Sequence, residues 1–254
     1  MDETDNGMDV ADRDDVNAER RRQSRRKGDA IGAHGPQGDA HPPASGTCPV
    51  CLSEQIDVFM QVERKCYWRC RRCAATYLER SQLPSAREEL QRYQQHRNDV
   101  HDPRYRAFLS RLAMPLLRVL PPKSRGLDYG CGPGPALAHM LREAGHSVRL
   151  YDPFFEPDAA ALAQTYDFIT CTEVVEHFHD PAREFARLYA LLENGGTLAI
   201  MTCFQTDDAG FANWRYRRDP THVVMYREQT FRYLATHYGL SCEIPGKDIV
   251  LLTK

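Results

Sequence analysis

The spacing of apolar residues divides the chain into four stretches. Residues 1–46 contain almost no large apolar residues and mix acidic with basic runs, so they cannot bury enough surface to offset the entropy of ordering. Residues 47–80 combine cysteines with arginines and aromatic residues, residues 81–122 repeat apolar residues at helical spacing, and residues 123–254 alternate short apolar runs with helical patterns. We therefore expect a disordered tail, a small module, a helical cover and a main domain, in that order.

The main domain has the pattern of an α/β fold. Strand-like apolar runs occupy residues 147–152, 166–171 and 197–202, and helical patterns separate most of them. Strands that alternate with helices form a doubly wound, mostly parallel sheet. Two final apolar runs, joined across Pro245 and Gly246, predict a closing antiparallel hairpin.

A glycine-rich turn opens the main domain. Residues 127–134 lead from an apolar strand into three glycines spaced two apart, namely Gly130, Gly132 and Gly134. A helical pattern follows from Pro135, so the segment is typical of the first half of a mononucleotide-binding βαβ unit. Such turns serve NAD, FAD, nucleotides and S-adenosylmethionine alike. Asp128, just before the glycines, would repel a pyrophosphate and could accept hydrogen bonds from an ammonium group, which favours a cationic, amino-acid-like ligand.

A second acid, Asp152, ends the next strand-like run. In a βαβ unit, the acid at the tip of the second strand lies where ribose hydroxyls bind, and a carboxylate can accept hydrogen bonds from both hydroxyls. We therefore predict Asp152 as a ribose ligand.

Two C-x₂-C pairs mark the small module. Cys48 and Cys51 are separated from Cys70 and Cys73 by eighteen residues, a spacing that suits a tetrahedral four-thiolate zinc site on paired hairpins, a zinc ribbon. Because protein would fill all four coordination positions, the metal would be structural. Cys66 is the spare cysteine, and its offset from Cys70 fits such a knuckle less well.

Composition narrows the class of protein. The 254 residues carry a formal net charge of -2, which argues against a chain that binds nucleic acid over its whole surface. No apolar run approaches the ~20 residues that span a bilayer, and the N-terminus is too polar for a signal peptide. We expect a cytoplasmic protein without a membrane span. The nine cysteines, an odd count, favour metal ligands and free thiols over a disulfide framework.

Taken in order, these motifs resemble the class I S-adenosylmethionine-dependent methyltransferases. The resemblance is carried by residues 127–134, Asp152, residues 166–168, the E-V-V-E-H signature at residues 173–177 and residues 192–198. That signature resembles the branch that methylates small molecules such as quinones and sugars. The resemblance implies S-adenosylmethionine as the cofactor and a set of nine residues around it. These are Asp128, Gly130, Gly132, Gly134, Asp152, Pro153, Phe154, Thr172 and Glu173.

The chain departs from that family between its second and fourth strands. Only thirteen residues separate Asp152 from Tyr166, where the family fits a helix, a third strand and an acidic adenine-binding loop. A helix and a strand hardly fit in that length, so we expect the third strand to be short or lost. Phe154, Phe155 and Asp158 would then flank the adenine.

The acceptor is predicted to lie against residues 211–226, which in relatives fold over the cofactor. The candidate acceptor-binding residues are Tyr93, His96, Trp214, Tyr216, Arg217 and Tyr226. An acceptor hydroxyl must lose its proton as it attacks the methyl group, so a base is useful. His222 is the first candidate base and His177 the second, although His222 could instead hold the turn after Pro220.

Two other functions fit the same sequence. Some ribosomal-RNA methyltransferases also join a zinc ribbon to this domain, and the arginines around Cys70, with aromatic residues among them, give the predicted ribbon a basic face that could bind RNA. Alternatively, the chain could be a non-catalytic docking protein that keeps the fold. The small-molecule methyltransferase is the preferred reading, and the acceptor and oligomeric state stay open.

Overall fold

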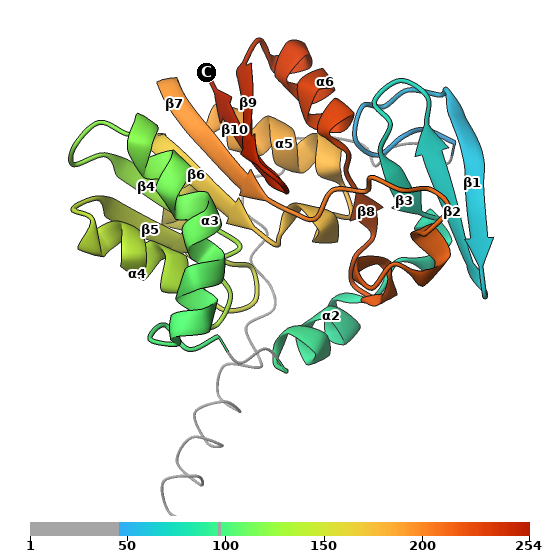
Figure 1. Ribbon diagram of the computed structural model, residues 1–254, viewed down its shortest axis with the longest axis horizontal. Helices are drawn as coiled ribbons and strands as arrows, with labels where there is room; N and C mark the ends of the chain where they lie inside the picture. The colour runs from blue at the N-terminus through green and yellow to red at the C-terminus, as the bar shows by residue number, and fades with distance from the viewer. Residues whose placement is uncertain (1–45, 96–97) are drawn as a thin grey trace, which may run out of the picture. The chain divides into compact units, whose positions relative to one another are not determined.

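The computed structural model describes residues 46–95 and 98–254 (Figure 1). His96 and, apart from Gly46, the tail predicted at residues 1–46 lie outside the described residues. The described residues belong to one compact unit.

The centre of the fold is a six-stranded sheet in the order β5-β4-β6-β7-β10-β9 (Figure 1). Its strands are β4 (Arg125–Tyr129), β5 (Ser147–Tyr151), β6 (Tyr166–Thr172), β7 (Leu192–Met201), β9 (Ser241–Gly246) and β10 (Ile249–Thr253). The first four are mutually parallel, whereas β10 runs antiparallel to both β7 and β9. The predicted α/β class and the closing hairpin are confirmed.

The expected loss of the third strand is also confirmed. Between β5 and β6 the chain forms only an isolated bridge from Asp152 to Glu156 and the short 3-10 helix η3 (Ala159–Ala163). β5 is therefore one of the two edge strands of the sheet, and β9 is the other. The short connection brings the chain back to the sheet without crossing a third strand.

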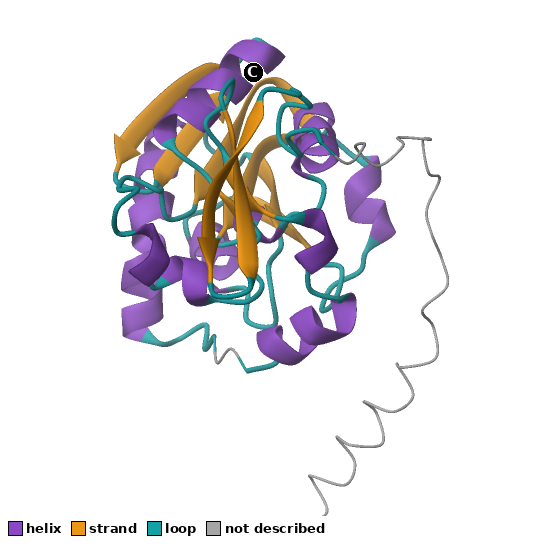
Figure 2. Ribbon diagram, turned by 90° about the vertical axis from the view of Figure 1, so that its right-hand side faces the viewer, coloured by secondary structure: helices purple, strands orange, loops and turns teal. Residues whose placement is uncertain are grey.

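Helices cover both faces of the sheet (Figure 2). Because side chains alternate along a strand, Leu198 and Ile200 of β7 belong to one apolar cluster and Ala199 and Met201 to the other. The helices α3 (Pro103–Val119) and α4 (Ala136–Glu143) pack on the Met201 face, and α5 (Pro181–Ala190) and α6 (Glu228–Tyr238) on the Ile200 face.

The helix ends follow local sequence signals. Ser85 and Glu88 form a capping box at the start of α2 (Ala86–Tyr93). Asp102 caps α3 and is followed by proline in the first turn, where a missing N–H costs no hydrogen bond. Gly239 ends α6 in the left-handed conformation. These signals fix where the three helices begin or end.

The small module is a four-stranded antiparallel sheet in the order β1-β2-β3-β8. Its strands are β1 (Ile56–Val62), β2 (Lys65–Cys70), β3 (Thr76–Leu78) and β8 (Val224–Met225). β8 comes from the segment between β7 and α6, and pairs Thr76 with Met225 and Tyr77 with Val224. The module is thus completed by a strand from the other end of the chain. Its buried Tyr67 also shares an apolar cluster with α5 and α6.

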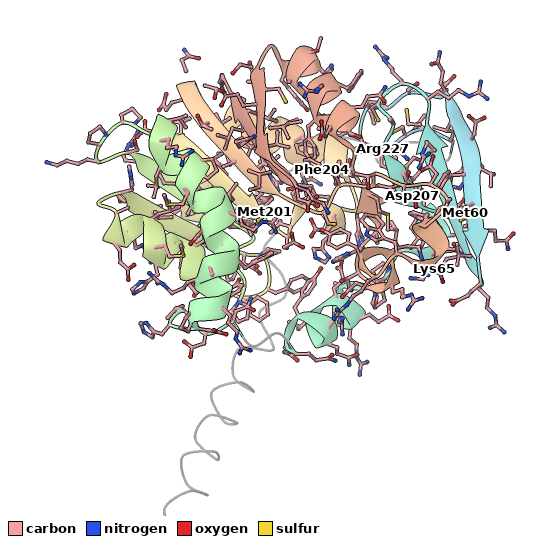
Figure 3. The ribbon with its side chains drawn as sticks, viewed as in Figure 1. Met60, Lys65, Met201, Phe204, Asp207 and Arg227 are labelled. Carbon is pink, nitrogen blue, oxygen red and sulfur yellow. The ribbon has the colours of Figure 1, made fainter. Side chains whose placement is uncertain are left out.

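An ion-pair network reinforces this junction. Asp208 accepts hydrogen bonds from both terminal nitrogens of Arg69 on β2, at 2.6 and 2.8 Å. The same carboxylate pairs with Arg227, which lies at the boundary between α6 and the module (Figure 3). The Asp208 carboxylate therefore links Arg69 of the module to Arg227 at the start of α6.

Candidate functional site

A cavity of about 790 Å³ lies at the carboxyl ends of β4, β5 and β6, the edge where α/β sheets bind ligands. Thirteen residues predicted from the sequence line it: Tyr93, Asp128, Gly130, Gly132, Gly134, Asp152, Pro153, Phe154, Phe155, Thr172, Glu173, His177 and His222. Its volume lies in the range of small-molecule and cofactor sites. Residues from distant parts of the chain thus meet around one cavity.

The glycine turn forms one wall of this cavity. Gly130 has a φ of +78°, and a Cβ there would lie 2.5 Å from the side chain of Val174. At Gly134, a Cβ would lie 1.8 Å from the carbonyl oxygen of Asn98, so the chain before α3 can cross the turn only because no side chain is present. The two glycines allow β6 and the segment before α3 to close around the cavity.

Asp152 organises the second wall. One carboxylate oxygen accepts the N–H of Gly132 at 3.0 Å, and the other accepts those of Phe154 at 2.8 Å and Phe155 at 3.1 Å. A carboxylate offers about four acceptor positions, so one remains for a ligand hydroxyl. Asp152 therefore fixes both loops around the cavity and keeps the capacity to bind a ligand.

Asp128 lies deeper in the same wall. Its carboxylate is fully buried and accepts the hydroxyl of Thr170 at 2.7 Å. Burial raises the pKa of Asp128 to about 6, against a smaller opposing effect of the Thr170 hydrogen bond. Among the described residues, the Asp128 carboxylate has no hydrogen bond or ion pair with an arginine or lysine side chain. A bound cationic group would supply the missing charge.

Beyond β6, an acid and two imidazoles form a cluster. Ligand atoms of Glu176, His177 and His222 all lie within 4.8 Å of one another. Glu176 accepts the hydroxyl of Thr202 at 2.9 Å and that of Tyr216. The His177 ring bonds to the carbonyl of Thr221 through Nδ1 at 2.9 Å, which leaves its other nitrogen available.

His222 has an unsatisfied ring nitrogen. Its Nδ1 is buried and has no hydrogen-bond partner among the described residues. Burial lowers the pKa of His222, although the charge of Glu176 opposes the effect. The imidazole is therefore neutral near pH 7 and can accept a proton or bind a cation. Its ring packs against that of His177 with centroids 4.7 Å apart.

Glu173 lies between the strand β6 and the acid–imidazole cluster along the chain, and its backbone conformation is uncommon. Its φ is +53°, a left-handed value that is costly for a residue with a side chain, and its N–H is held by the carbonyl of Met201 at 2.8 Å. Burial, followed by the charge of Glu176, raises the pKa of Glu173 to about 8. The strained turn aims Glu173 and Val174 toward the cavity that they line.

Sequence reasoning missed several cavity residues near His177. Glu89 of α2 is buried and bonds to His179 Nε2 at 3.0 Å and to the Tyr93 hydroxyl at 3.5 Å. Tyr93 packs edge-on against both Phe154 and His177. α2 thus supplies a polar and aromatic side of the cavity, facing the acid–imidazole cluster. Glu176 of the acid–imidazole cluster was also missed, although it lies within the E-V-V-E-H signature.

Four other predicted acceptor residues, all in the described part of the chain, do not line this cavity: Trp214, Tyr216, Arg217 and Tyr226. Tyr226 is fully buried and donates to the carbonyl of Val175 at 2.9 Å, so it supports the cluster from behind. Arg217 is buried against Tyr67, 3.4 Å from its hydroxyl. Tyr216 reaches the cluster through Glu176, and Trp214 packs on Tyr216 with centroids 5.2 Å apart.

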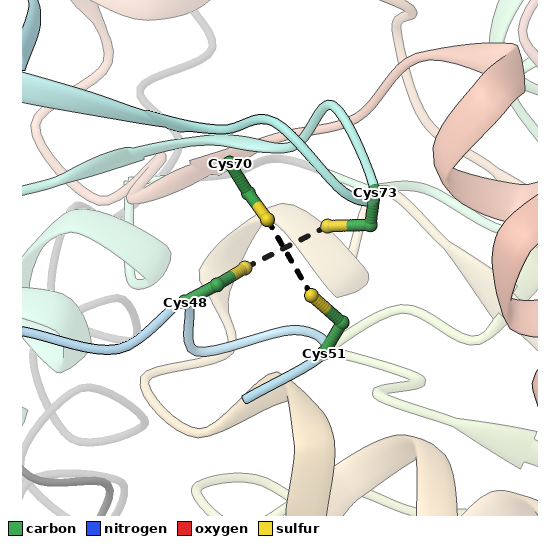
Figure 4. Close-up of side chains that lie close together, drawn as sticks. All are labelled: Cys48, Cys51, Cys70 and Cys73. Atoms are coloured by element: carbon green, nitrogen blue, oxygen red, sulfur yellow. Dashed lines mark hydrogen bonds between the residues drawn. The ribbon is translucent and has the colours of Figure 1, made fainter. Parts of the chain in front are cut away.

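The four cysteines predicted as metal ligands come together (Figure 4). Cys48 Sγ lies 3.6 Å from Cys73 Sγ, and Cys51 Sγ lies 3.5 Å from Cys70 Sγ. Tetrahedral zinc with bonds of about 2.3 Å requires sulfur separations of about 3.8 Å, so the four sulfurs fit such an ion. The Arg72 N–H, 3.3 Å from Cys70 Sγ, supports a thiolate there.

The arginines of the module are largely engaged within the chain. Arg69 pairs with Asp208, Arg71 pairs with Asp57, and the guanidinium of Arg72 lies 5.5 Å from the ring centre of Tyr233. Among the aromatic side chains near them, Tyr67 and Tyr77 are buried, and the half-buried Trp68 donates through Nε1 to Glu79 at 2.7 Å.

Within residues 46–95 and 98–254, none of the helices combines the length and the apolar character needed to cross a bilayer.

Comparison with known proteins places these features in context. A family model described as a methyltransferase domain matches residues 93–243. The ubiquinone biosynthesis O-methyltransferase of Saccharophagus degradans is 37% identical over 78 residues, which cover 30% of this chain and 33% of that protein. The corresponding enzyme of Aeromonas salmonicida is 35% identical over 78 residues, covering 30% and 32%. The chain thus spans about a third of the length of the curated relatives that it matches.

Solved structures are similar at a lower level. An O-methyltransferase family protein from Burkholderia thailandensis is 20% identical, with coverage of 69% of this chain and 65% of that chain and a TM-score of 0.44. The 1,6-didemethyltoxoflavin N1-methyltransferase of the same organism is 19% identical, with coverage of 57% and 76% and a TM-score of 0.42.

Proposed function

Since the chain belongs to the methyltransferase-domain family, we propose that it transfers the methyl group of S-adenosylmethionine to a hydroxyl group of a small-molecule acceptor. One observation carries this proposal: the glycine turn and the acid–imidazole cluster border the same cavity. The first can hold the cofactor, and the second can receive the acceptor's proton. The family model covers both.

The cofactor is proposed to bind along the glycine turn. Asp152 retains an acceptor position for the ribose hydroxyls, and the buried carboxylate of Asp128 faces the wall where the amino-acid part would lie. Among the other ionisable cavity residues, the acids Glu89, Asp180, Glu184 and Asp219 outnumber the arginines Arg183 and Arg187. This excess of acids favours a ligand with ammonium and sulfonium charges.

The acceptor is proposed to lie between α2 and the cluster. As its oxygen attacks, the methyl carbon forms a bond to oxygen and its bond to sulfur breaks, so the sulfonium becomes a neutral thioether. The acceptor's proton passes to the neutral imidazole of His222, and Glu176 stabilises the resulting imidazolium. Most of the acceleration would come from positioning the two reactants in a cavity sheltered from water.

The same three side chains can also hold a divalent cation. Glu176, His177 and His222 supply an oxygen and two imidazoles, the unpaired His222 Nδ1 fits a ligand role, and the His177 ring is oriented by a backbone carbonyl as metal-bound histidines are. A bound cation would lower the pKa of an acceptor hydroxyl. A hydroxyl acceptor fits this cluster, because a neutral imidazole and a bound cation both favour loss of the hydroxyl proton, whereas a neutral amine attacks through its lone pair and needs neither.

A zinc ion bound to Cys48, Cys51, Cys70 and Cys73 completes the proposal. It would be structural, because the four thiolates leave no open position.

The test begins with calorimetry of S-adenosylmethionine binding, followed by S-adenosylhomocysteine release with a panel of phenols and alcohols. Matched amines serve as controls, and each reaction is run with Mg²⁺ or Mn²⁺ and with a chelator too weak to remove structural zinc. We expect micromolar cofactor binding and turnover only with hydroxyl compounds. Absence of cofactor binding at millimolar concentration would contradict the methyltransferase assignment, and turnover confined to amines would contradict the acceptor class.

A further inference from the structure

One side of the cavity of about 790 Å³ has no role in the proposed methyl transfer. It is lined by the last residues of β4 and β5 and by three residues of α5: Tyr129, Tyr151, Arg183, Glu184 and Arg187. Tyr129 and Tyr151 lie in or against the apolar cluster that contains Ile200, whereas Leu150 packs against the cluster of the opposite face. This α5 side of the cavity is therefore on the Ile200 face of the sheet.

The lost third strand leaves the α5 side of the cavity uncovered. A connection between parallel strands usually contains a helix that covers one face of the sheet, but β5 and β6 are joined only by an isolated bridge and the short helix η3. η3 packs near the start of β6, where the Tyr166 hydroxyl donates to the carbonyl of Ala161 at 2.7 Å. The carboxyl ends of β4 and β5 thus stay open on this face, and Tyr151 is only half-buried.

Three polar side chains on the α5 side hold one another in place. The Tyr129 hydroxyl donates to Glu184, and Arg187 Nη1 donates to the same hydroxyl at 3.2 Å and to both Glu184 carboxylate oxygens at 3.1 Å. The side chains of Glu184 and Arg187 are 19% and 30% exposed. Since a carboxylate offers about four acceptor positions, Glu184 keeps one for a ligand, and Arg187 keeps its Nη2 donors.

The α5 side adjoins the predicted ribose ligand. Asp152 directly follows Tyr151 in the chain. Asp128 lies toward the other face, since burial raises its pKa and smaller effects of Arg142 and Ala138, both in α4, oppose the rise. A ribose carries its base on C1′ and the amino-acid part through C5′, on either side of the ring oxygen. With the amino-acid part toward Asp128, the base of a nucleoside at Asp152 lies toward Tyr151 and α5.

The polar groups of the α5 side match one edge of adenine. Adenine presents an amino group, which donates, beside a ring nitrogen, which accepts. Glu184 can accept from the amino group and Arg187 can donate to the ring nitrogen. Two other acids fit less well. Asp158 is exposed and does not line the cavity, and Asp180 caps α5 by accepting the N–H of Arg183 at 3.4 Å.

We propose that α5 recognises the adenine of the cofactor, with Glu184 accepting from its amino group and Arg187 donating to the adjacent ring nitrogen. Tyr129 is the positioning residue, because its hydroxyl orients Glu184. This inference rests on the proposed function, since it requires S-adenosylmethionine as the ligand. It makes selectivity for the cofactor's base a property of α5, on the face that the lost third strand leaves open.

The test compares two ligands that differ at one position of the base and does not require turnover. S-adenosylhomocysteine and S-inosylhomocysteine, in which an oxygen replaces the amino group, are each titrated into the intact chain by calorimetry. We expect the parent to bind the adenine ligand roughly ten-fold more tightly or better, the effect of one hydrogen bond to a charged group. Glu184→Gln should reduce this preference below about three-fold, because a carboxamide can accept from an amino group or donate to an oxygen.

Two further variants complete the test. Asp158→Asn changes the exposed acid after β5 and should keep the parent's preference. Tyr129→Phe removes only the hydroxyl that holds Glu184, so it should lower the preference to an intermediate value, whether or not Glu184→Gln folds.

Equal binding of the two ligands by the parent overturns the proposal. So does a Glu184→Gln variant that weakens both ligands by the same factor, as loss of a merely structural contact would, or a preference that disappears in Asp158→Asn. If neither ligand binds the parent at millimolar concentration, the proposed function itself fails, and this inference fails with it.

Discussion

The backbone N–H of Val223 donates a hydrogen bond to the carbonyl of Glu176 at 2.8 Å. The carbonyl of Val223 in turn accepts the N–H of Leu78 at 2.8 Å. A single residue beside His222 thus connects the ribbon strand β3 to the short helix η4 (Val175–His177), which carries two members of the acid–imidazole cluster. The ribbon is therefore part of the scaffold of the candidate site.

This connection predicts that zinc removal impairs turnover before cofactor binding. Cys70→Ser should abolish the expected zinc content of about one per chain, lower the thermal unfolding temperature and reduce kcat at least ten-fold. The glycine turn and Asp152 lie on the main sheet, so the affinity for S-adenosylmethionine should change less. Zinc analysis, calorimetry and turnover measure the three effects. Cys66→Ser, in the same module but outside the cluster, is the matched control, and equal loss of cofactor affinity and kcat would contradict the connection.

Asp152 should determine cofactor affinity. Asp152→Asn removes the charge and one of the oxygen acceptors while keeping the side-chain size, and hydrogen bonds to charged groups contribute about 1.5–3 kcal/mol. We expect the Kd for S-adenosylmethionine to rise by about 10- to 100-fold. Asp158 was predicted beside the adenine, but it is exposed and does not line the cavity, so Asp158→Asn should leave the Kd within a factor of two. Titration calorimetry gives both values, and similar behaviour of the two variants would exclude Asp152 as a ribose ligand.

The glycine turn offers a matched pair of substitutions. A Cβ at Gly130 would meet Val174 at 2.5 Å, whereas a Cβ at Gly132 would meet no atom within 4 Å, and both residues have positive φ. Gly130→Ala should therefore destabilise the free protein more than Gly132→Ala. The open space at Gly132 is expected to be the cofactor's, so Gly132→Ala should weaken cofactor binding beyond its effect on stability. Urea unfolding and calorimetry separate the two quantities, and a reversed order of stabilities would contradict the geometry.

A site residue can be predicted from the sequence when the motif that marks it is short, and not when its partners are distant in the sequence. The positions of Asp128 and Asp152 at the cavity, and the clustering of the four cysteines, were predictable because each residue belongs to a short motif whose spacing implies its surroundings. Glu89 was not, because its partner His179 is 90 residues away and the capping box of its helix marks only the helix start. The two-residue strand β8 is too short for any apolar periodicity, so its pairing with β3 depends wholly on the tertiary fold.

Dependence on the tertiary fold also explains why the predicted acceptor residues do not line the cavity. Trp214, Tyr216, Arg217 and Tyr226 share a segment rich in aromatic and basic residues, but composition does not say which side chains turn inward. Tyr226 is buried against Val175 and Arg217 against Tyr67, since β8 carries this segment onto the ribbon. The third strand was easier to predict, because a count of residues between β5 and β6 suffices.

His222 should affect chemistry more than binding. His222→Ala removes the proposed proton acceptor, and such groups contribute about 10²- to 10⁴-fold to rate, so we expect kcat to fall in that range while cofactor affinity changes less than two-fold. His237→Ala, near the end of α6 and outside the cavity, is the control. Single-turnover kinetics with bound S-adenosylmethionine measures the chemical step directly. An unchanged rate would show that His222 only holds the turn after Pro220.

The ionised Asp128 carboxylate should lower the stability of the cofactor-free protein and raise its affinity for the cofactor. Its pKa is raised from 3.8 to about 6 by burial, so the folded state binds the proton more tightly than the unfolded state does. Its contribution to stability is thus fully present below about pH 4 and is lost as pH rises through about 6, a change of about 3 kcal/mol.

Asp128→Asn should remove this part of the pH dependence. The cofactor-free variant should then be more stable than the parent at pH 7, while its affinity for S-adenosylmethionine falls. Urea unfolding at pH 4 and pH 7 measures the first effect and calorimetry the second. Glu243→Gln, at an exposed acid of β9, should retain the parent's pH dependence, and an Asp128→Asn variant that also retains it would show that this carboxyl does not titrate in that window.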